Sequence, residues 1–330
     1  MKDEIRAYVL DGTPDAVQGS LKTLPSASLP PGEVTIKVEY SGINYKDAMI
    51  AAGVGKMVRK FPHVPGVDLA GTVESDATGK FKPGAPVLVT GYDLGVGAWG
   101  GYAEGARVPA AWVVPLPAGL SAKEAATLGT AGFTAMLAVL ALERNGLKPS
   151  QGPVLVTGAT GGVGSIAVAL LARAGYTVAA SSGKPEMKEF LTRLGAGQIL
   201  SRQEVTDASG KAMLKEQWAG AIDNAGGTTL EYLLRSVKGG GSVALTGLVS
   251  SANFTGTVYP FILRGVNLLG IDSVNCPMEA RLEAWRLLAG PRKPQHLDEI
   301  GHEIGLADLP AKLKEILGGR AKGRYVVKVG

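Results

Sequence analysis

A glycine-rich stretch in the middle of the chain carries the strongest chemical signal. Residues 154–166 read Val-Leu-Val-Thr-Gly-Ala-Thr-Gly-Gly-Val-Gly-Ser-Ile, which predicts a buried strand, a tight turn and a helix. Such a turn lets the backbone approach a pyrophosphate, and the helix N-terminus offers N–H groups and the positive end of its dipole. Ala159 stands where the usual G-x-G-x-x-G pattern has its first glycine. We still expect a dinucleotide-binding loop, because a strand precedes the turn and a helix follows it. The alternative is a tight turn in another kind of α/β protein.

The next predicted strand ends where dinucleotide-binding proteins contact the adenosine ribose. Residues 180–184 read Ala-Ser-Ser-Gly-Lys and contain no carboxylate, although an Asp or Glu here would accept the ribose hydroxyls of NAD. Two hydroxyls, a glycine amide and a lysine favour a 2′-phosphate instead, and Arg202 could supply a second cation. These residues predict NADPH rather than NADH. The alternative is that Lys184 and Arg202 are solvated surface charges, and Glu186 is evidence against a phosphate site.

The elements that must position these residues divide the chain into two parts. At 330 residues the chain exceeds the size of most single hydrophobic cores, so we expect two domains. The first 120 or so residues hold short strand-like runs broken by Pro and Gly, of which 33–39 is the clearest, and they predict a small β-barrel or sandwich. From about Ser121, short continuous apolar runs alternate with helical runs. This pattern predicts a parallel sheet covered on both faces.

Composition excludes several classes of protein. Apolar residues make up 45% and charged residues 19% of the chain, which excludes a disordered protein. The net charge of +5 is spread along the chain, so we expect a small anionic partner and no nucleic acid. The single cysteine, Cys276, excludes an intramolecular disulfide framework and a multi-cysteine metal site. The charged start lacks the apolar stretch of a secretion signal, so we expect a cytoplasmic protein.

One apolar stretch requires a check against a membrane span. Residues 125–142 carry no charge, but they include three threonines and two glycines. Ser121 and Glu124 just before them form a predicted capping box, and Gly146 and Pro149 end the segment. We therefore expect a buried helix and no membrane partner.

Motifs along essentially the whole chain resemble the zinc-independent medium-chain dehydrogenase/reductases, and within them the acryloyl-CoA reductase branch, which is quinone oxidoreductase-like. The motifs are Asn44-Tyr-Lys-Asp47, residues 61–68, 129–136, 217–223, 260–264 and 270–274, and Gly323-Arg324. The resemblance implies an α/β protein with two domains. A GroES-like β-barrel catalytic domain spans residues 1–124 and is completed by 295–330. A Rossmann NADP-binding domain with a doubly wound parallel sheet spans residues 125–294.

The resemblance also implies contacts and partners. The residues it implies for NADPH are Tyr45, Thr160, Gly161, Gly162, Val163, Ser182, Gly183, Lys184, Arg202, Leu248, Ile262 and Ser273. Residues 317–320 depart from the branch, which usually has amide side chains there, so no contact is expected from them. A homodimer through the Rossmann edge strand, near residues 267–272, is implied as well.

Zinc-dependent relatives place ligands at two positions that differ here. The Gly-x-Cys-His-x-Asp pattern has Asn44 in place of its cysteine, and the Pro-Gly-His-Glu pattern has Val67 in place of its histidine. A catalytic zinc site needs about three ligands drawn from Cys, His and carboxylate side chains. The three histidines, His63, His296 and His302, are widely separated in the sequence. We therefore expect no metal and no oxidation of a zinc-bound alkoxide.

The chemistry expected instead is hydride addition to a conjugated acceptor, such as an enone, a quinone or an enoyl thioester. Negative charge then develops on the carbonyl oxygen and needs a hydrogen-bond donor. Tyr45 is the first candidate for a catalytic donor, ahead of Asn44 and Lys46. The alternative for Tyr45 is an aromatic ring that only packs against the cofactor.

We therefore expect an NADPH-dependent reductase of a short 2-enoyl-CoA, which converts acryloyl-CoA to propanoyl-CoA. Lys56, Arg59 and Lys60 could bind the phosphates of CoA, although a solvated basic loop is the simpler interpretation. The alternatives are an NADPH:quinone or enone oxidoreductase and an NADPH-binding regulator with low turnover.

Overall fold

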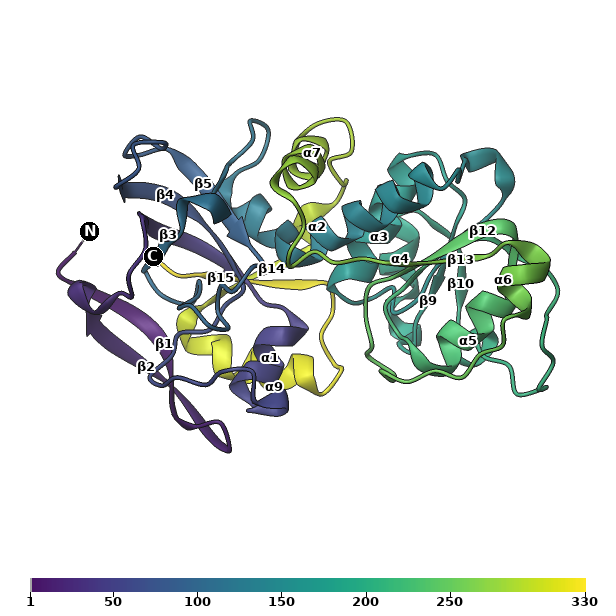
Figure 1. Cartoon of the computed structure of the whole chain (residues 1–330), viewed down its shortest axis with the longest axis horizontal. Helices are drawn as coiled ribbons and strands as arrows, with labels where there is room; N and C mark the ends of the chain where they lie inside the picture. The colour runs from purple at the N-terminus through teal and green to yellow at the C-terminus, as the bar shows by residue number, and fades with distance from the viewer. Residues whose placement is uncertain (1) are drawn as a thin grey trace. The chain divides into compact units, whose positions relative to one another are not determined.

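The computed structural model describes residues 2–330, which form two compact units (Figure 1). The first unit contains the chain up to Thr130 together with Val274–Ala289 and Leu297–Gly330, and the second contains Ala131–Ser273 and Gly290–His296. The boundaries thus differ from the expected 1–124, 125–294 and 295–330. Residues 274–289 pack with the first unit because Arg281 donates to the carbonyl (2.7 Å) and hydroxyl (2.9 Å) oxygens of Thr90. No local sequence pattern shows this long-range contact.

The second unit has the doubly wound parallel sheet that the sequence predicts. Its strand order is β10-β9-β8-β11-β12-β13, in which the first strand, β8, lies at the centre and the chain winds outward in both directions. The strands are β8 (Val154–Val156), β9 (Val178–Ser181), β10 (Ala196–Leu200), β11 (Trp218–Asp223), β12 (Val237–Leu245) and β13 (Asn267–Gly270). The helices are α3 (Gly162–Arg173), α4 (Lys188–Arg193), α5 (Gly227–Ser236) and α6 (Tyr259–Arg264). The central strand β8 is fully buried, which explains its continuous apolar sequence.

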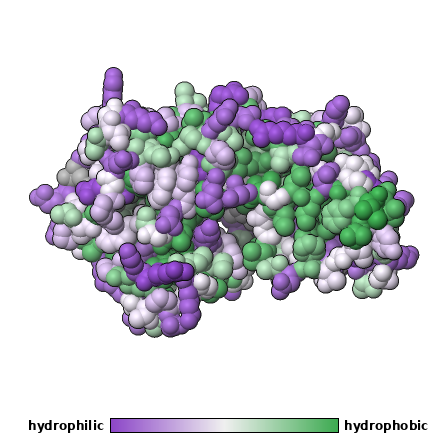
Figure 2. All heavy atoms as spheres, viewed as in Figure 1, coloured by the Kyte–Doolittle hydropathy of each residue, from purple (hydrophilic) through white to green (hydrophobic). Residues whose placement is uncertain are grey.

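Large apolar side chains are exposed near the β13 end of this sheet. Val258, Ile262 and Leu263, on and beside α6, are 64%, 69% and 65% exposed. Figure 2 shows apolar residues gathered over this end of the second unit. In the described part of the chain, β13 pairs with β12 alone and so has an open edge.

The first unit is built on an antiparallel sheet that the C-terminal strand completes. The strand order is β14-β15-β3-β4-β5-β7, and β6 also pairs with β3. The bounds are β3 (Val34–Gly42), β4 (Asp68–Asp76), β5 (Pro86–Thr90), β6 (Gly105–Val108), β7 (Val114–Pro115), β14 (Gly301–Gly305) and β15 (Arg324–Lys328). A hairpin of β1 (Glu4–Thr13) and β2 (Ala16–Pro25) forms a separate two-stranded sheet. The helices are α1 (Tyr45–Ala51), α7 (Met278–Ala289), α8 (Leu297–Ile300) and α9 (Leu309–Leu317).

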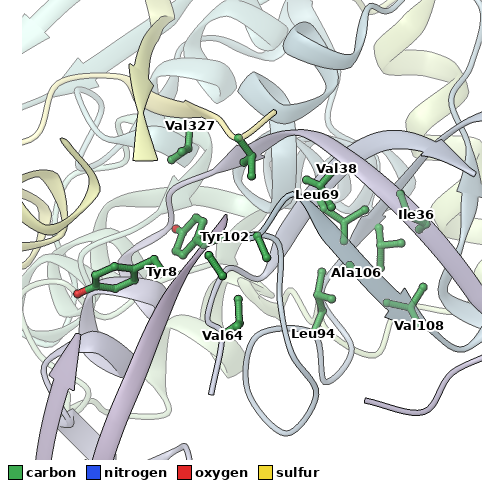
Figure 3. Packing of buried hydrophobic residues seen from close by; sticks show 14 of the residues in the cluster. Tyr8, Ile36, Val38, Val64, Leu69, Leu94, Tyr102, Ala106, Val108 and Val327 are labelled. Atoms are coloured by element: carbon green, nitrogen blue, oxygen red, sulfur yellow. The ribbon is translucent and has the colours of Figure 1, made fainter. Parts of the chain in front are cut away.

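The core of the first unit joins residues that are far apart in the sequence. Ile36 and Val38 of β3 and Val327 of β15 belong to one buried cluster with Leu69 and Tyr102 (Figure 3). The predicted alternation in β3 explains this arrangement, because apolar residues at every second position face the same side of a strand. The core fixes β3, β4 and β15, whose ends carry the polar residues described below.

The long apolar helix α2 (Ala122–Arg144) belongs to the folded interior. The helix is long and apolar enough to cross a membrane, but 78% of its most apolar 18-residue stretch is buried within the protein. The predicted capping box is confirmed, since the Ser121 hydroxyl accepts the N–H of Glu124 (3.2 Å) and the Glu124 carboxylate accepts the N–H of Ser121 (2.9 Å). The helix is kinked at Gly129, next to the boundary between the two units.

Candidate cofactor and catalytic site

The glycine-rich turn of the second unit lies between β8 and α3. Gly161 is the N-cap of α3 and provides no side-chain cap, so the first N–H groups of the helix can donate to an anion. A Cβ at Gly164 would collide with the carbonyl oxygen of Gly158, which explains why this turn needs a glycine there. Gly162 and Val163 form the first turn of the helix. This arrangement can receive a pyrophosphate.

The residues predicted for the 2′-phosphate meet at the carboxyl ends of β9 and β10. The hydroxyl oxygens of Thr160 and Ser182 are 3.2 Å apart, and the backbone N–H of Lys184 donates to the Ser182 hydroxyl (3.0 Å). A Cβ at Gly183 would lie 2.7 Å from Nε of Arg202, so the Arg202 side chain packs directly on the glycine backbone. Hydroxyls, amides and a guanidinium therefore share one corner of the second unit.

Acidic residues near this corner take part in local structure. Glu186 lies in the first turn of a short helix, Pro185–Met187, in agreement with the sequence interpretation that it begins a helix. The Glu204 carboxylate accepts both the backbone N–H and the hydroxyl of Ser201, each at 2.8 Å. These bonds hold the pKa of Glu204 below its usual value. The carboxylate of Glu204 is therefore engaged in its own turn.

The other predicted contacts of the second unit lie on different elements. Ser273 is buried and its hydroxyl accepts a hydrogen bond from Thr134 (2.8 Å). Leu248 lies in the loop after β12 and is 53% exposed. Ile262 lies on α6, whose last residue, Arg264, donates to the carbonyl of Leu214 (2.6 Å) before β11. That end of α6 therefore lies at the amino ends of the strands, whereas the glycine-rich turn lies at their carboxyl ends. The contact of Ile262 with the cofactor stays a prediction.

In the first unit, Tyr45 begins α1 and its side chain is 38% exposed. The preceding residue, Asn44, is the N-cap of this helix. The fully buried carboxylate of Asp47 accepts the backbone N–H groups of Asn44 (2.8 Å) and Val67 (3.0 Å), and so joins the two segments that carry ligands in zinc-dependent relatives. Burial, followed by the nearby charge of Asp68, raises the pKa of Asp47 to about 6.

A buried network of side chains fixes the amide of Asn44. Its Nδ2 donates to Asp68 (2.7 Å), and its Oδ1 accepts from Arg324 (2.8 Å). Asp68 also accepts from the Arg324 guanidinium (3.2 Å) and from the hydroxyl (2.5 Å) and N–H (2.9 Å) of Thr130. An amide NH₂ group carries two N–H donors. Among the described residues, Asn44 uses one of them for Asp68, so the second N–H can donate to another acceptor.

This network is possible because α2 is kinked at a glycine. Gly129 has φ +48° and ψ −153°, a conformation that side chains rarely adopt. A Cβ at this residue would collide with the carboxylate of Asp68 and lie 2.6 Å from the guanidinium of Arg324. The kink places Thr130 where its hydroxyl and its N–H both reach Asp68.

The donor set at these positions does not fit a catalytic zinc ion. Val67 provides no ligand, and the carboxylate of Asp68 and the amide oxygen of Asn44 are both bonded to the cationic Arg324. A zinc ion is bound by thiolate, imidazole or carboxylate ligands. Here Arg324 already donates hydrogen bonds to the oxygens that would have to bind the ion. Among residues 2–330, no group of three or more His, Cys, Asp or Glu side chains is placed to hold a metal ion.

Sequence reasoning did not select Asp47, Asp68, Thr130 and Arg324 as site residues, although it included each of them in a motif. For the three charged residues the signal is a charge at the start of an apolar run, as in Asp68-Leu-Ala and Arg324-Tyr-Val-Val, whereas Thr130 gives no such signal. A buried charge without a partner would be expensive, so each implies a partner elsewhere in the chain. The identity of that partner depends on the fold.

Comparisons with known proteins agree with this arrangement. Residues 30–118 match the alcohol dehydrogenase GroES-like domain, and residues 162–290 match the zinc-binding dehydrogenase domain. The chain is 50% identical to the acrylyl-CoA reductase AcuI of Ruegeria pomeroyi over 94% of each chain. The chain belongs to the medium-chain dehydrogenase/reductases. Asn44 and Val67, at the positions of two zinc ligands, place this medium-chain reductase in the zinc-independent branch. The family consists of NAD(P)H-dependent oxidoreductases.

Solved structures match the medium-chain reductase over almost its whole length. The YhdH oxidoreductase of Salmonella enterica, in complex with NADP, is 45% identical with a TM-score of 0.95, and the match covers 98% of this chain and 100% of that one. Bacillus subtilis YhfP, solved with NAD bound, has a TM-score of 0.95 at 48% identity and covers 99% and 100% of the two chains. YhfP carries a quinone oxidoreductase name. The predicted Rossmann and GroES-like fold is confirmed.

Proposed function

We propose that this oxidoreductase reduces the C=C bond of a short 2-enoyl-CoA with NADPH and converts acryloyl-CoA to propanoyl-CoA. The observation that carries the proposal is the Asn44–Asp68–Arg324 network, which fixes the amide of Asn44 at the position where zinc-dependent relatives have a cysteine ligand. This amide would serve as a hydrogen-bond donor to the substrate. A conjugated thioester needs such a donor at its carbonyl oxygen and no metal. The relative from Ruegeria pomeroyi, named an acrylyl-CoA reductase, supports this substrate class.

The residues around the glycine-rich turn fit NADPH. The N-terminus of α3 would hold the pyrophosphate, and Ser182, Lys184 and Arg202 would hold the 2′-phosphate. When bound, NADPH supplies the hydride that adds to the β-carbon of the substrate. The NADP-bound relative supports this choice, while the NAD-bound relative makes the 2′-phosphate preference a point to test.

Residues of the first unit would stabilise the charge and provide the proton. The remaining N–H of Asn44 would donate to the thioester oxygen, on which negative charge develops. The hydroxyl of Tyr45, half-exposed at the start of α1, would deliver the proton that the α-carbon gains. One hydride and one proton together account for the two hydrogens that saturate the double bond.

The basic loop after α1 would bind the nucleotide part of CoA. Arg59 and Lys60 are exposed on this loop, and Lys56 forms an exposed ion pair with Asp15. Exposed cations of this kind can bind phosphates by charge-assisted hydrogen bonds. Binding of the CoA phosphates by this loop would favour a CoA thioester over a quinone as the substrate.

We also infer that the protein forms a homodimer through β13 and α6. The exposed side chains of Val258, Ile262 and Leu263 form the kind of apolar surface that marks a protein interface. The open edge of β13 beside them could pair with the same strand of a second copy.

The test is a comparison of acceptors at saturating NADPH. The loss of nicotinamide absorbance is followed with acryloyl-CoA and with benzoquinone, and kcat/KM is expected to be higher for the thioester. A higher value for benzoquinone would favour a quinone oxidoreductase, the function that the name of YhfP suggests. Tight NADPH binding without oxidation by any acceptor would indicate a regulator.

A further inference from the structure

A buried carboxylate at the end of β11 has no part in the proposed chemistry. Asp223 is fully buried in the second unit, and its oxygens accept the hydroxyl of Thr157 (2.5 Å) and the N–H groups of Ala225 (3.0 Å) and Gly226 (2.9 Å). Burial raises the pKa of Asp223. Burying a carboxylate costs free energy unless hydrogen bonds compensate for it. The three donors around Asp223 provide this compensation, which indicates that the carboxylate has a role in holding these segments together.

One of these donors, Thr157, is the residue just before the glycine-rich turn. Its backbone N–H donates to the carbonyl of Ile222 (3.0 Å), and its hydroxyl oxygen also accepts the N–H of Asn224 (3.0 Å). Its carbonyl accepts the side-chain amide of Asn224 (2.7 Å). All the polar groups of Thr157 are thus bonded to residues 222–224. These bonds fix the direction in which the chain leaves β8 and enters the turn at Gly158, where φ is +56°.

The same residues hold the loop after β12, in which Leu248 lies. The hydroxyl of Thr246 donates to the side-chain oxygen of Asn224 (2.8 Å). The N–H groups of Val249 and Ser250 donate to the carbonyls of Asn224 (3.3 Å) and Ala225 (2.8 Å). The loops at 157–161, 223–227 and 246–251 therefore form one hydrogen-bonded unit at the carboxyl edge of the sheet.

We propose that Asp223 is a positioning residue for the dinucleotide, because it holds the glycine-rich turn and the loop after β12 in the arrangement that receives the pyrophosphate. This inference rests on the proposed binding of NADPH. A carboxylate suits the position because it only accepts hydrogen bonds. An asparagine would turn an NH₂ group toward the hydroxyl of Thr157 or toward the N–H groups of the turn.

The test measures the Kd for NADPH by fluorescence titration, well below the midpoint of thermal unfolding of each variant. Asp223→Asn and Thr157→Val are expected to bind NADPH about tenfold more weakly, the effect of losing roughly 1.4 kcal/mol. Thr157→Ser keeps the hydroxyl and is expected to bind within about twofold of the wild type. The matched control is Ser236→Ala, which removes a buried hydroxyl at the C-terminal end of α5, the end away from the 223–227 loop, where it donates to the carbonyl of Tyr232.

Each outcome separates this inference from the proposed function. Unchanged NADPH binding by folded Asp223→Asn and Thr157→Val proteins would overturn the positioning role. Equal weakening in Ser236→Ala would also overturn it, since the effect would then reflect general damage to the second unit. If Asp223→Asn does not fold, the Thr157→Val and Thr157→Ser pair decides. A wild-type protein that does not bind NADPH would contradict the proposed function itself.

Discussion

We expect single residues of the second unit to set the preference between the two nicotinamide cofactors. Ser182, Lys184 and Arg202 lie on two neighbouring strand ends, where the corner they form carries positive charge and hydrogen-bond donors. The 2′-phosphate distinguishes NADPH from NADH, so the contribution of these residues should appear only with NADPH.

We expect Lys184→Ala to raise the Kd for NADPH about tenfold, because about 1.4 kcal/mol of a charge-assisted contact is lost. The Kd for NADH should change by less than about twofold. Lys188→Ala, which removes an exposed cation four residues further along, is the matched control. An equal loss for both cofactors would show that Lys184 does not contact the 2′-phosphate.

We expect Tyr45→Phe to lower kcat for acryloyl-CoA by about a hundredfold, the usual range for loss of a general acid. The Kd for NADPH should stay within about twofold of the wild type, since the variant keeps the aromatic ring that we expect to contact the cofactor. Steady-state kinetics and a binding titration measure the two effects. A variant with undiminished kcat would assign Tyr45 a packing role only.

The buried carboxyl of Asp47 should make stability depend on pH. Its pKa is raised to about 6 in the folded protein, so the folded state binds the proton more tightly than the unfolded state. The stability gained from this proton is fully present below about pH 4 and is lost as the pH rises through about 6. Relative to Asp47→Asn, which mimics the neutral form, the wild type should lose about 2 kcal/mol of unfolding free energy between pH 4 and 7. A difference that is constant with pH, measured by urea unfolding, would contradict the raised pKa.

At the scale of elements, the kink of α2 determines whether the first unit can form its polar network. We expect Gly129→Ala to lower the free energy of unfolding by about 3 kcal/mol, because it adds backbone strain and a collision with Asp68. Gly146→Ala is the matched control, since φ is +89° at Gly146 and a Cβ there would have open space around it. Its cost should be about 1–2 kcal/mol, from strain alone. Equal costs would show that the collision is relieved without loss of packing.

Local pattern predicted most elements that carry the site. The strands β8, β9, β11 and β13, the second half of β12 and the helix α3 follow from continuous apolar runs and from the turn residues between them. The hairpin β1–β2 could not be predicted in this way, since most residues of β2 are exposed and show no alternation. The segment that contains α7 was expected in the Rossmann domain, and it lies in the first unit because of the contact between Arg281 and Thr90.

The parts of the candidate site made of consecutive residues could be predicted from the sequence. The parts that depend on contacts between distant residues could not. Thr160 to Val163 are consecutive and lie at one strand end. Asp68 and Arg324 are separated by 256 residues, and only the pairing of β15 with β3 and of β3 with β4 brings their sites together. The network around Asp223 has the same cause, since parallel strands join three separate loops at one edge.

At the scale of the whole molecule, the open edge of β13 and the apolar side chains beside it predict a dimer. We expect Ile262→Glu to convert a dimer to a monomer in sedimentation velocity experiments, since it places a charge at the centre of the apolar surface. Leu21→Glu, at an exposed apolar residue of the first unit, should leave the dimer intact. A wild-type monomer at micromolar concentration, or an unchanged dimer in Ile262→Glu, would contradict this interface.

The central claim is that the protein delivers a hydride from NADPH to the β-carbon of an enoyl thioester. Mass spectrometry of the product formed from acryloyl-CoA and NADPH deuterated on the transferring face of nicotinamide C4 tests it most directly. We predict propanoyl-CoA with one deuterium on its β-carbon, formed by protein treated with a zinc chelator. Unreacted acryloyl-CoA, or propanoyl-CoA formed only after zinc is restored, would contradict the account.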